Sequence, residues 1–583
     1  MQPQITVLDA GGQYCHLIAR KVRDLGVYAE VAPSETPASE LLGRKGIIIS
    51  GGPSSVYDPG SPTIDPRLLH TRTPILGICY GQQLIAHLLG GHVEKGERGE
   101  YGFAQLDLLR ESRLFRGVEG PQQVWMSHRD LVEAPPPGFQ VLASTRTCTI
   151  AAMASAKKGV YAVQFHPEVA HTPSGKRILE NFLFDVCGCA RDWNPTGQVL
   201  QLEEQIRATA RERGVFFFVS GGVDSTVAYT LCLRALSPDR VRGTYVDTGL
   251  MREGETDFVR ANFQSLGAHG FQVEDASSRF LHGLANAVDP ERKREVIGEE
   301  FVRVQERILE TEHFLNGHWI LGQGTIYPDT IESGGTAKAD LIKTHHNRVP
   351  GIQRLIDEGK IVEPLASFYK DEVRAIGREL GLPADMLDRH PFPGPGLAIR
   401  CLCSEESGAP EKTPGGWVLP VRSVGVQGDS RTYRKTLAID DFPASADEAA
   451  HLVNASDGVN RVIVNVGATN RIAEMRSVPS RLTRERLARL RRADAIVRRF
   501  CEDSGFEREV WQFPVVLIPF GTADRPDSIV LRPIDSVDGM TASVVRMSED
   551  LLDTMTRELK KLEGIAGVFY DLTNKPPATI EWE

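Results

Sequence analysis

The sequence predicts an α/β protein with two open parallel sheets, followed by an α+β region made of two similar subdomains. Short β-rich runs alternate with helical stretches in the first third of the chain, as in a sheet with helices on its faces. The same rhythm restarts near residue 198, and a weak internal repeat follows residue 401. Because 583 residues exceed what one hydrophobic core holds, we expect four domains: 1–192, 198–400, 401–478 and 479–583.

Turn-forming segments separate the first two domains from each other and from the rest. The β-rich runs of the first domain are Ile5–Leu8, Ile47–Ile49, Ile75–Ile78 and Val160–Phe165. Residues 191–197 (RDWNPTG) concentrate turn formers and a proline, which predicts a linker. In the second domain, the apolar run Val215–Val219 leads into a glycine turn. Pro391–Gly396 (PFPGPG) cannot lie inside a regular element and marks the end of that domain.

The last region repeats a pattern of β-rich runs. Val418–Val421 (VLPV) and Gly458–Val466 (GVNRVIVNV) are echoed by Val516–Pro519 (VLIP) and Gly564–Leu572 (GIAGVFYDL). Between the two copies, Ser480 can cap a helix with apolar residues at a spacing of three or four. We interpret the arginines of that helix as a solvated face.

Composition excludes several classes of protein. With 41% hydrophobic and 25% charged residues, the chain has the usage of a globular protein, and its net charge of −10 does not favour nucleic acid. No basic stretch followed by an apolar one opens the sequence, and no run of about 18 apolar residues occurs. The nine cysteines include pairs spaced too closely for a typical zinc knuckle. We expect a cytoplasmic protein without a membrane or nucleic-acid partner and without a metal cage.

A candidate cysteine nucleophile lies in the first domain. Gly77–Gly81 (GICYG) follows a β-rich run and precedes a helical stretch, which is the layout of a nucleophile elbow. Alone, this pattern also fits a buried packing cysteine. Gln164–Glu168 (QFHPE) adds His166 as a base and Glu168 as the carboxylate that orients it. Ser50–Pro53 (SGGP) adds a glycine turn whose amides can approach an oxyanion.

At these residues the first domain resembles the class I glutamine amidotransferases over its whole length. The resemblance implies that Cys79 attacks the glutamine carboxamide, that His166 moves the proton and that Glu168 orients His166. It also implies that the backbone amides of Gly52 and Tyr80 bind the oxyanion.

The same resemblance implies that Gln83 contacts glutamine. One position departs from the pattern. Within Met126–Asp130 (MSHRD), related synthetases usually carry glycine in place of Arg129, which leaves the local loop geometry open.

A second candidate site opens the second domain. Val219–Thr226 (VSGGVDST) joins a strand to a helix, so that free amides and hydroxyls converge on an anion-sized space. The stretch lacks the Gly-Lys-Ser/Thr ending of the common nucleotide loop, which disfavours γ-phosphate transfer. It resembles the loop of the ATP pyrophosphatase family. The resemblance implies that Mg²⁺ accompanies ATP near Asp224, and that ATP is bound by these residues: Ser220, Gly221, Gly222, Val223, Asp224, Ser225 and Thr226.

Further stretches resemble the GMP synthetases, and with them the resemblance covers essentially the whole chain. They are Gln323–Ser333, Ile342–Asn347 (IKTHHN), Phe368–Arg374 (FYKDEVR), Arg389–Arg400 and Asn574–Glu583 (NKPPATIEWE). Lys343, His345 and His346 have the donors needed to neutralise leaving pyrophosphate. The resemblance implies XMP contacts by Arg294, Asp429, Gln512, Lys575 and Glu581.

The resemblance implies that the chain aminates XMP to GMP, the last step of de novo guanine nucleotide synthesis. ATP and glutamine would be its other substrates, and no tightly bound organic cofactor is expected. Two fused subdomains can pair with each other inside one chain, so we expect a monomer or a homodimer and doubt an obligate dimer.

Two alternatives remain. A related synthetase would make NAD or asparagine or thiolate RNA, and the type of amidotransferase and the Lys-Pro-Pro tail argue against it. A regulatory nucleotide-binding protein would carry an inactive amidotransferase module, and the intact Cys79, His166 and Glu168 argue against that.

Overall fold

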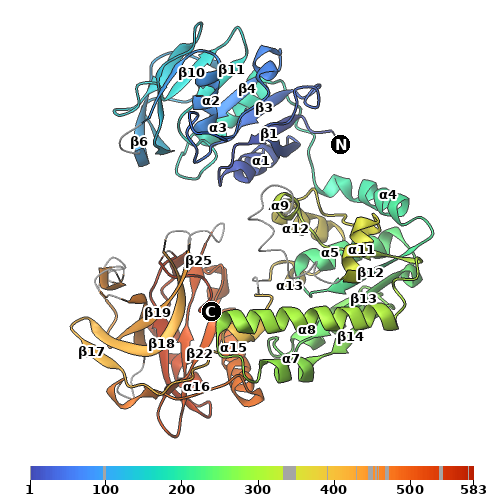
Figure 1. Ribbon diagram of the computed structural model, residues 1–583, viewed down its shortest axis with the longest axis vertical. Helices are drawn as coiled ribbons and strands as arrows, with labels where there is room; N and C mark the ends of the chain where they lie inside the picture. Colours follow the sequence, from blue (N-terminus) through green and yellow to red (C-terminus); the bar gives the residue numbers. More distant parts are fainter. Residues whose placement is uncertain are drawn as a thin grey trace. The chain divides into compact units, whose positions relative to one another are not determined.

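The computed structural model describes residues 2–583 apart from a set of short segments (Figure 1). The segments left out are 96–99, 333–349, 390–391, 428–429, 444–448, 450, 454–455, 457, 467–471, 537–541 and 576. The chain divides into two compact units, Met1–Gln198 and Val199–Glu583. None of the described helices is long and apolar enough to cross a membrane.

The first unit is built on a nine-stranded sheet with the order β2-β1-β3-β4-β11-β10-β9-β6-β7. The strands from β2 to β11 pair in parallel, as expected, but the rest of the sheet is antiparallel and corrects the expectation of an open parallel sheet. The parallel strands are β1 (Ile5–Asp9), β2 (Ala29–Pro33), β3 (Gly46–Ile49), β4 (Ile75–Ile78) and β11 (Val160–Val163). The antiparallel ones are β6 (Glu100–Leu108), β7 (Gln122–His128), β9 (Gln140–Ser144) and β10 (Ala152–Ser155).

Helices cover this sheet and carry its site. The strands β3 and β4 are buried along their whole length, since parallel strands are covered on both faces. The smaller hairpin joins β5 (His92–Glu94) to β8 (Leu131–Ala134). The helices are α1 (Cys15–Asp24), α2 (Tyr80–Leu88) and α3 (Gly175–Glu180).

The second unit begins with a five-stranded sheet in the order β14-β13-β12-β15-β16, in which every pair is parallel. This is the open parallel sheet that the sequence predicts. Its strands are β12 (Gly214–Val219), β13 (Val241–Asp247), β14 (Phe271–Asp275), β15 (Trp319–Gly322) and β16 (Ile361–Val362). Its helices are α4 (Val199–Ala210), α5 (Val223–Ala235), α6 (Glu255–Ser265), α7 (Ser277–Leu284), α8 (Pro290–Thr311), α9 (Tyr327–Glu332), α11 (Pro350–Asp357), α12 (Lys370–Glu379) and α13 (Ala384–Leu387).

The rest of the second unit is one seven-stranded sheet in the order β17-β18-β19-β20-β27-β24-β22. Its strands are β17 (Glu411–Thr413), β18 (Gly416–Gln427), β19 (Ser430–Ile439), β20 (Val459–Val466), β22 (Val515–Ile518), β24 (Asp527–Leu531) and β27 (Ile565–Asp571). Two ribbons accompany it, β21 (Arg476–Ser477) with β23 (Phe520–Gly521) and β25 (Ile534–Asp535) with β26 (Ser543–Val544). The helices are α15 (Arg484–Ser504) and α16 (Glu549–Leu559).

The internal repeat is visible in the topology of this sheet. In the first copy, β18 is antiparallel to β19, which is parallel to β20. In the second copy, β22 is antiparallel to β24, which is parallel to β27. The copies meet where β20 pairs with β27 in antiparallel orientation. The expected separate subdomains therefore need a correction, because both copies contribute to one sheet and share its hydrophobic core.

Candidate active sites

Cys79 lies in a sharp turn between β4 and α2. Its φ of 53° and ψ of −107° are rare for a residue with a side chain. The neighbouring glycines make the turn possible. A Cβ on Gly77 would lie 2.6 Å from the carbonyl oxygen of Gly81, and a Cβ on Gly81 would lie 2.5 Å from that of Ile49. The strand and the helix are thus packed too closely for any other residue, and the thiol is held at the start of α2.

His166 follows β11 and faces this thiol. Its Nδ1 lies 2.7 Å from Oε1 of Glu168, and both side chains are buried. Burial by itself lowers the pKa of His166, but the charge of Glu168 and the hydrogen bond with Cys79 outweigh it, so that the pKa is raised to about 10. The imidazole therefore keeps its proton at neutral pH.

The expected oxyanion turn lies beside this pair. A Cβ on Gly51 would come within 3.1 Å of Cε1 of His166 and 3.5 Å of the Cβ of Cys79. Gly52 is as crowded, since its Cβ would lie 2.3 Å from the carbonyl oxygen of Ala10. Tyr80 is the first residue of α2, where backbone amides lack a partner within the helix. The structure thus brings Gly52 and Tyr80 to the two sides of Cys79.

Gln83 is buried in the first turns of α2, and its side-chain amide already has partners. Nε2 donates to the carbonyl oxygen of Asp130 at 2.7 Å and lies 3.4 Å from Oε1 of Gln164. This amide ties the helix to the segment after β7. Arg129, the departure from the family pattern, is exposed to solvent.

Sequence reasoning misses two residues near the thiol. The carbonyl oxygen of Ser127 lies 3.5 Å from Sγ of Cys79. The ring of Tyr14 meets that of His166 edge to face, with the centroids 5.2 Å apart. Ser127 belongs to the MSHRD stretch, which is a signal in the sequence, whereas nothing in the sequence singles out Tyr14.

The 220–226 loop joins β12 to α5 as predicted. Oγ of Ser220 lies 3.0 Å from Oγ of Ser225 and accepts from the amide of Gly222 at 3.2 Å. Gly221 has a φ of 73°, which favours glycine. Thr226 donates to the carbonyl oxygen of Gly222 at 2.9 Å. The loop therefore holds its shape by internal bonds, and its amides stand at the positive end of α5.

A pocket of about 540 Å³ adjoins this loop. Its walls include residues 218–223, the end of β13, one face of α8 and residues 392–395. Four basic side chains line it: Arg294, Lys370, Arg374 and Arg389. Cationic side chains beside free loop amides suit a polyanion such as a nucleoside triphosphate.

Lys370 lies in one of the stretches that match the family, but sequence reasoning assigns it no role. Its Nζ lies 2.5 Å from Oδ2 of Asp224. Among the described residues, nothing forms a hydrogen bond with the buried Oδ1 of Asp224. A carboxylate oxygen left in this state beside a phosphate loop fits the donor set of Mg²⁺.

The predicted XMP residues fall into different surroundings. Arg294 lines the pocket. Glu581 accepts from Arg400 in a bidentate ion pair of 2.9 and 2.7 Å. Gln512 is buried beside Ile534 and Lys575 is paired through its backbone with Ala542, and of the described residues neither lines the pocket. The predicted site residues that lie outside the described part of the chain are Asp429, Lys343, His345 and His346.

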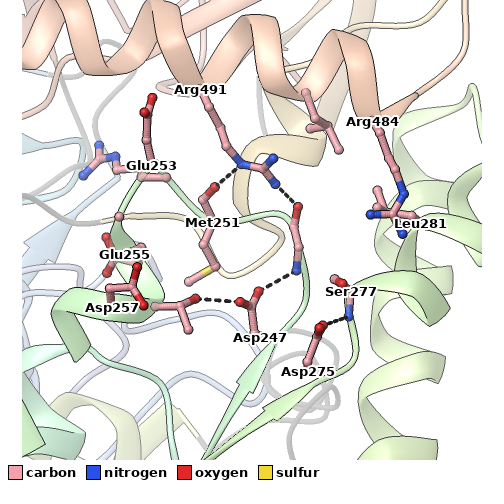
Figure 2. A pocket seen from close by; sticks show the side chains of 15 residues that line it. Asp247, Met251, Glu253, Glu255, Asp257, Asp275, Ser277, Leu281, Arg484 and Arg491 are labelled. Carbon is pink, nitrogen blue, oxygen red and sulfur yellow. Dashed lines mark hydrogen bonds between the residues drawn. The ribbon is translucent and has the colours of Figure 1, made fainter. Parts of the chain in front are cut away.

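A second pocket, of about 390 Å³, lies at the ends of β13 and β14 and is closed by α15 (Figure 2). Arg491 of α15 donates to the carbonyl oxygen of Met251 at 2.8 Å and to that of Gly249. Met251 also lines the nucleotide pocket. These bonds correct our interpretation of the α15 arginines as a solvated face, since the unpaired carbonyls of the 249–251 turn need donors.

The start of α15 also differs from the expectation. Thr483, not Ser480, caps the helix, because its hydroxyl accepts from the amide of Arg486 at 3.2 Å. The side chain of Arg486 is buried against Asp527. The helix is therefore anchored by its polar residues as well as by its apolar face.

Known proteins are similar to this chain over its whole length. A family model described as Glutamine amidotransferase class-I matches residues 6–186, and one described as GMP synthase C terminal domain matches residues 500–582. A probable GMP synthase [glutamine-hydrolyzing] of Leptospira interrogans is 41% identical over 600 residues, which are 100% of this chain and 99% of that protein. The GMP synthase [glutamine-hydrolyzing] of Thermomicrobium roseum is 41% identical over 99% of this chain and 96% of its own.

A solved structure is similar to part of the chain. It is a putative GMP synthase protein of Thermoplasma acidophilum, 34% identical, with a TM-score of 0.28. The match covers 32% of this chain and 94% of that one.

Proposed function

The chain belongs to the glutamine-hydrolysing GMP synthases, and we propose that it aminates XMP to GMP through an adenylyl-XMP intermediate. The family is established by relatives 38–41% identical over nearly their whole length. One observation supports the full reaction best. The chain combines a Cys79–His166–Glu168 triad in one unit with a cationic nucleotide pocket in the other.

Glutamine hydrolysis is the task we propose for the first unit. The sulfur of Cys79 attacks the carboxamide carbon of glutamine, and the oxyanion accepts from the amides of Gly52 and Tyr80. His166 then protonates the departing nitrogen, the C–N bond breaks and ammonia leaves a thioester. Water hydrolyses the thioester, which yields glutamate and restores the thiol. Glu168 keeps the imidazole oriented and charged throughout. Gln83, through its bonds to Asp130 and Gln164, supports the wall that contacts glutamine.

Activation of the acceptor is the task we propose for the second unit. The O2 oxygen of XMP attacks the α-phosphorus of ATP, and the bond to the bridging oxygen breaks to release pyrophosphate. Ammonia then adds at C2 and AMP leaves with the former O2 oxygen. The 220–226 loop and the cations Lys370, Arg374 and Arg389 bind the polyphosphate. Asp224 would hold the Mg²⁺ that enters with ATP, which neutralises phosphate charge when bound.

We also propose the acceptor contacts that the family implies. Arg294 lines the pocket and has a guanidinium suited to a phosphate or a purine carbonyl. Glu581 is connected to the same pocket, because its partner Arg400 packs 5.3 Å from the ring centre of Phe392, which is one of the lining residues. Asp429, Gln512 and Lys575 are proposed from family resemblance alone, as are these pyrophosphate contacts: Lys343, His345 and His346.

The test supplies XMP, ATP, Mg²⁺ and glutamine and follows the loss of absorbance at the XMP band. In Cys79→Ala we expect glutamine-dependent GMP formation to fall by about 10³-fold or more, while ammonia-dependent formation stays within about twofold. Cys189→Ala is the matched control, since this thiol lies in the same unit but outside the triad. Failure of the unaltered protein with both nitrogen donors would overturn the assignment.

A further inference from the structure

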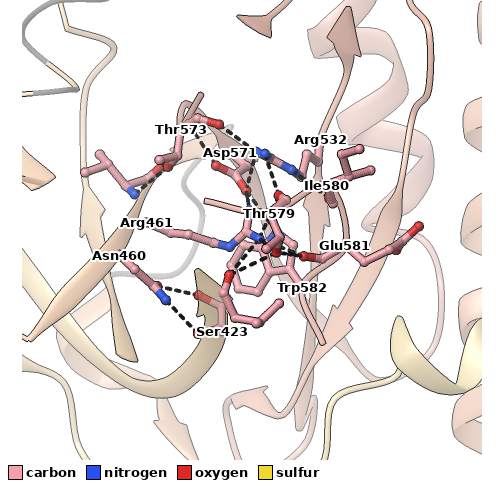
Figure 3. A network of polar contacts seen from close by, with 12 residues as sticks. Ser423, Asn460, Arg461, Arg532, Asp571, Thr573, Thr579, Ile580, Glu581 and Trp582 are labelled. Atoms are coloured by element: carbon pink, nitrogen blue, oxygen red, sulfur yellow. Dashed lines mark hydrogen bonds and ion pairs between the residues drawn. The ribbon is translucent and has the colours of Figure 1, made fainter. Parts of the chain in front are cut away.

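Residues 578–583, here called the 578–583 strap, lie against the seven-stranded sheet and are held there by buried side chains (Figure 3). Arg461 and Arg532 donate to the backbone carbonyls of residues 579–581, at 2.8 to 3.0 Å. Trp582 is fully buried and donates from Nε1 to Oδ2 of Asp571 at 2.9 Å. The strap is therefore an anchored part of the sheet, and its conformation is set by the sheet.

The strap also makes an ion pair with the domain that carries the nucleotide pocket. Nζ of Lys293, in the first turns of α8, lies 2.5 Å from Oε2 of Glu583. The same ammonium donates to the carbonyl oxygens of Cys401 at 3.0 Å and Ala398 at 3.3 Å. All three of its protons thus have acceptors, although the side chain is 0% exposed. Burial lowers the pKa of Lys293, but the charge of Glu583 outweighs it and the pKa is raised.

A second ion pair runs parallel to the first. The side chain of Arg400 is buried and forms its bidentate pair with Glu581, two residues before Glu583. In an extended segment, residues two apart point to the same side. Glu581 and Glu583 therefore face the pocket domain, whereas Trp582 between them faces the sheet.

Both partners of the strap stand directly behind walls of the nucleotide pocket. Lys293 precedes Arg294, which lines the pocket together with Ile297 and Phe301 on one face of α8. The carbonyls of Ala398 and Cys401 belong to the segment that follows the pocket wall 392–395. Lys293 itself does not line the pocket within the described part of the chain. Any effect it has on a bound nucleotide must pass through these neighbours.

We propose that Lys293 and Glu583 are a positioning pair that joins α8 to the strap, so that Arg294 and Glu581 are held at the mutual geometry that the acceptor nucleotide requires. The pair rests on the proposed function for the identity of the acceptor, a purine nucleoside monophosphate. It leaves the ATP loop alone, because the 220–226 loop is held by its own internal hydrogen bonds.

The test measures ammonia-dependent GMP formation in Glu583→Gln, Lys293→Met and the double variant. We expect KM for XMP to rise about 10- to 100-fold, since a small displacement of positioning groups has effects of this size. KM for ATP and the glutaminase rate should stay within about twofold. Because both residues act through one contact, the double variant should be no worse than Lys293→Met alone.

Arg354→Ala is the matched control, because it removes an ion pair with Glu358 from an exposed position in the same unit. Its KM values should not change. Equal increases in KM for XMP and ATP would show general damage to the pocket and overturn the proposal, as would unchanged values or additive effects in the double variant.

Hydrogen exchange separates this proposal from the proposed function. In Glu583→Gln we expect faster amide exchange in residues 290–298 and 578–583 than in the unaltered protein, with unchanged exchange in the first unit. This readout needs no turnover. If the unaltered protein does not convert XMP, the proposed function fails by itself, and unchanged exchange in the variant overturns the positioning pair.

Discussion

The charge of His166 is the property of a single residue on which glutamine hydrolysis depends most. Its pKa is raised to about 10, so the proton is present at neutral pH and is lost as the pH rises through that value. We expect glutamate release by the unaltered protein to be level from about pH 7 to 9 and to fall above it. The measurement is the dependence of the glutaminase kcat on pH.

Glu168→Gln supplies the control for this interpretation. The variant keeps the shape of the side chain but removes the charge that raises the pKa of His166, so burial should then lower that pKa. The alkaline limb should move to lower pH, and kcat at pH 8 should fall by about 10²-fold or more. An unchanged limb in the variant would contradict the assignment.

Lys370 is the residue whose role in the pocket we predict from its contact with Asp224. Lys370→Gln should lower the rate of XMP-dependent pyrophosphate release by about 10²-fold, since one cation beside the transferred phosphate is lost. Glutaminase activity should not change. Lys561→Gln, at an exposed site in the same unit, is the control. Equal rates in the two variants would remove Lys370 from the reaction.

At the scale of elements, the pairing of β20 with β27 is stabilised by a buried charge cluster. Asp571, near the end of β27, accepts from Arg461 at 2.8 Å and Arg532 at 2.9 Å, and all three side chains are 0% exposed. Asp571→Asn removes the counter-charge of two buried guanidiniums. We expect it to lower the free energy of unfolding of the second unit by about 3–5 kcal/mol, measured by urea denaturation.

The control for this seam is Asp503→Asn near the exposed end of α15, which should change the free energy of unfolding by less than about 0.5 kcal/mol. A similar stability of both variants would mean that the backbone ladder, and not the charge cluster, holds the two copies together.

At the scale of the whole molecule, the fused copies predict the oligomeric state. The antiparallel β20–β27 pair already joins two ββαβ-like halves within one chain, an arrangement that symmetric dimers reach across a two-fold axis. We therefore expect no obligate dimer. Size-exclusion chromatography with light scattering over a hundredfold range of about 0.1 to 10 µM would test this, given typical dimer affinities. A dimer that persists at every concentration would contradict it.

The local parts of both sites were predictable from the sequence because their geometry depends on neighbours in the chain. Glycines on either side of Cys79 permit its strained turn, and two residues separate His166 from the carboxylate that orients it. The 220–226 loop likewise forms by bonds within itself. The alternation of runs was enough for the parallel strands, and the weak repeat for the two copies, although not for the sheet that they share.

Only the tertiary structure decided which distant residues act together. Lys370 and Asp224 are 146 residues apart, and Lys293 and Glu583 are 290 apart. No periodicity or spacing connects such pairs, because their contacts depend on how sheets and helices pack and on which buried charges need partners. By itself the sequence determined the chemistry of the Cys79 triad and of the phosphate loop. The fold decided that arginines of α15 brace a pocket loop and that the strap holds α8, since burial turns each polar side chain toward a partner within reach.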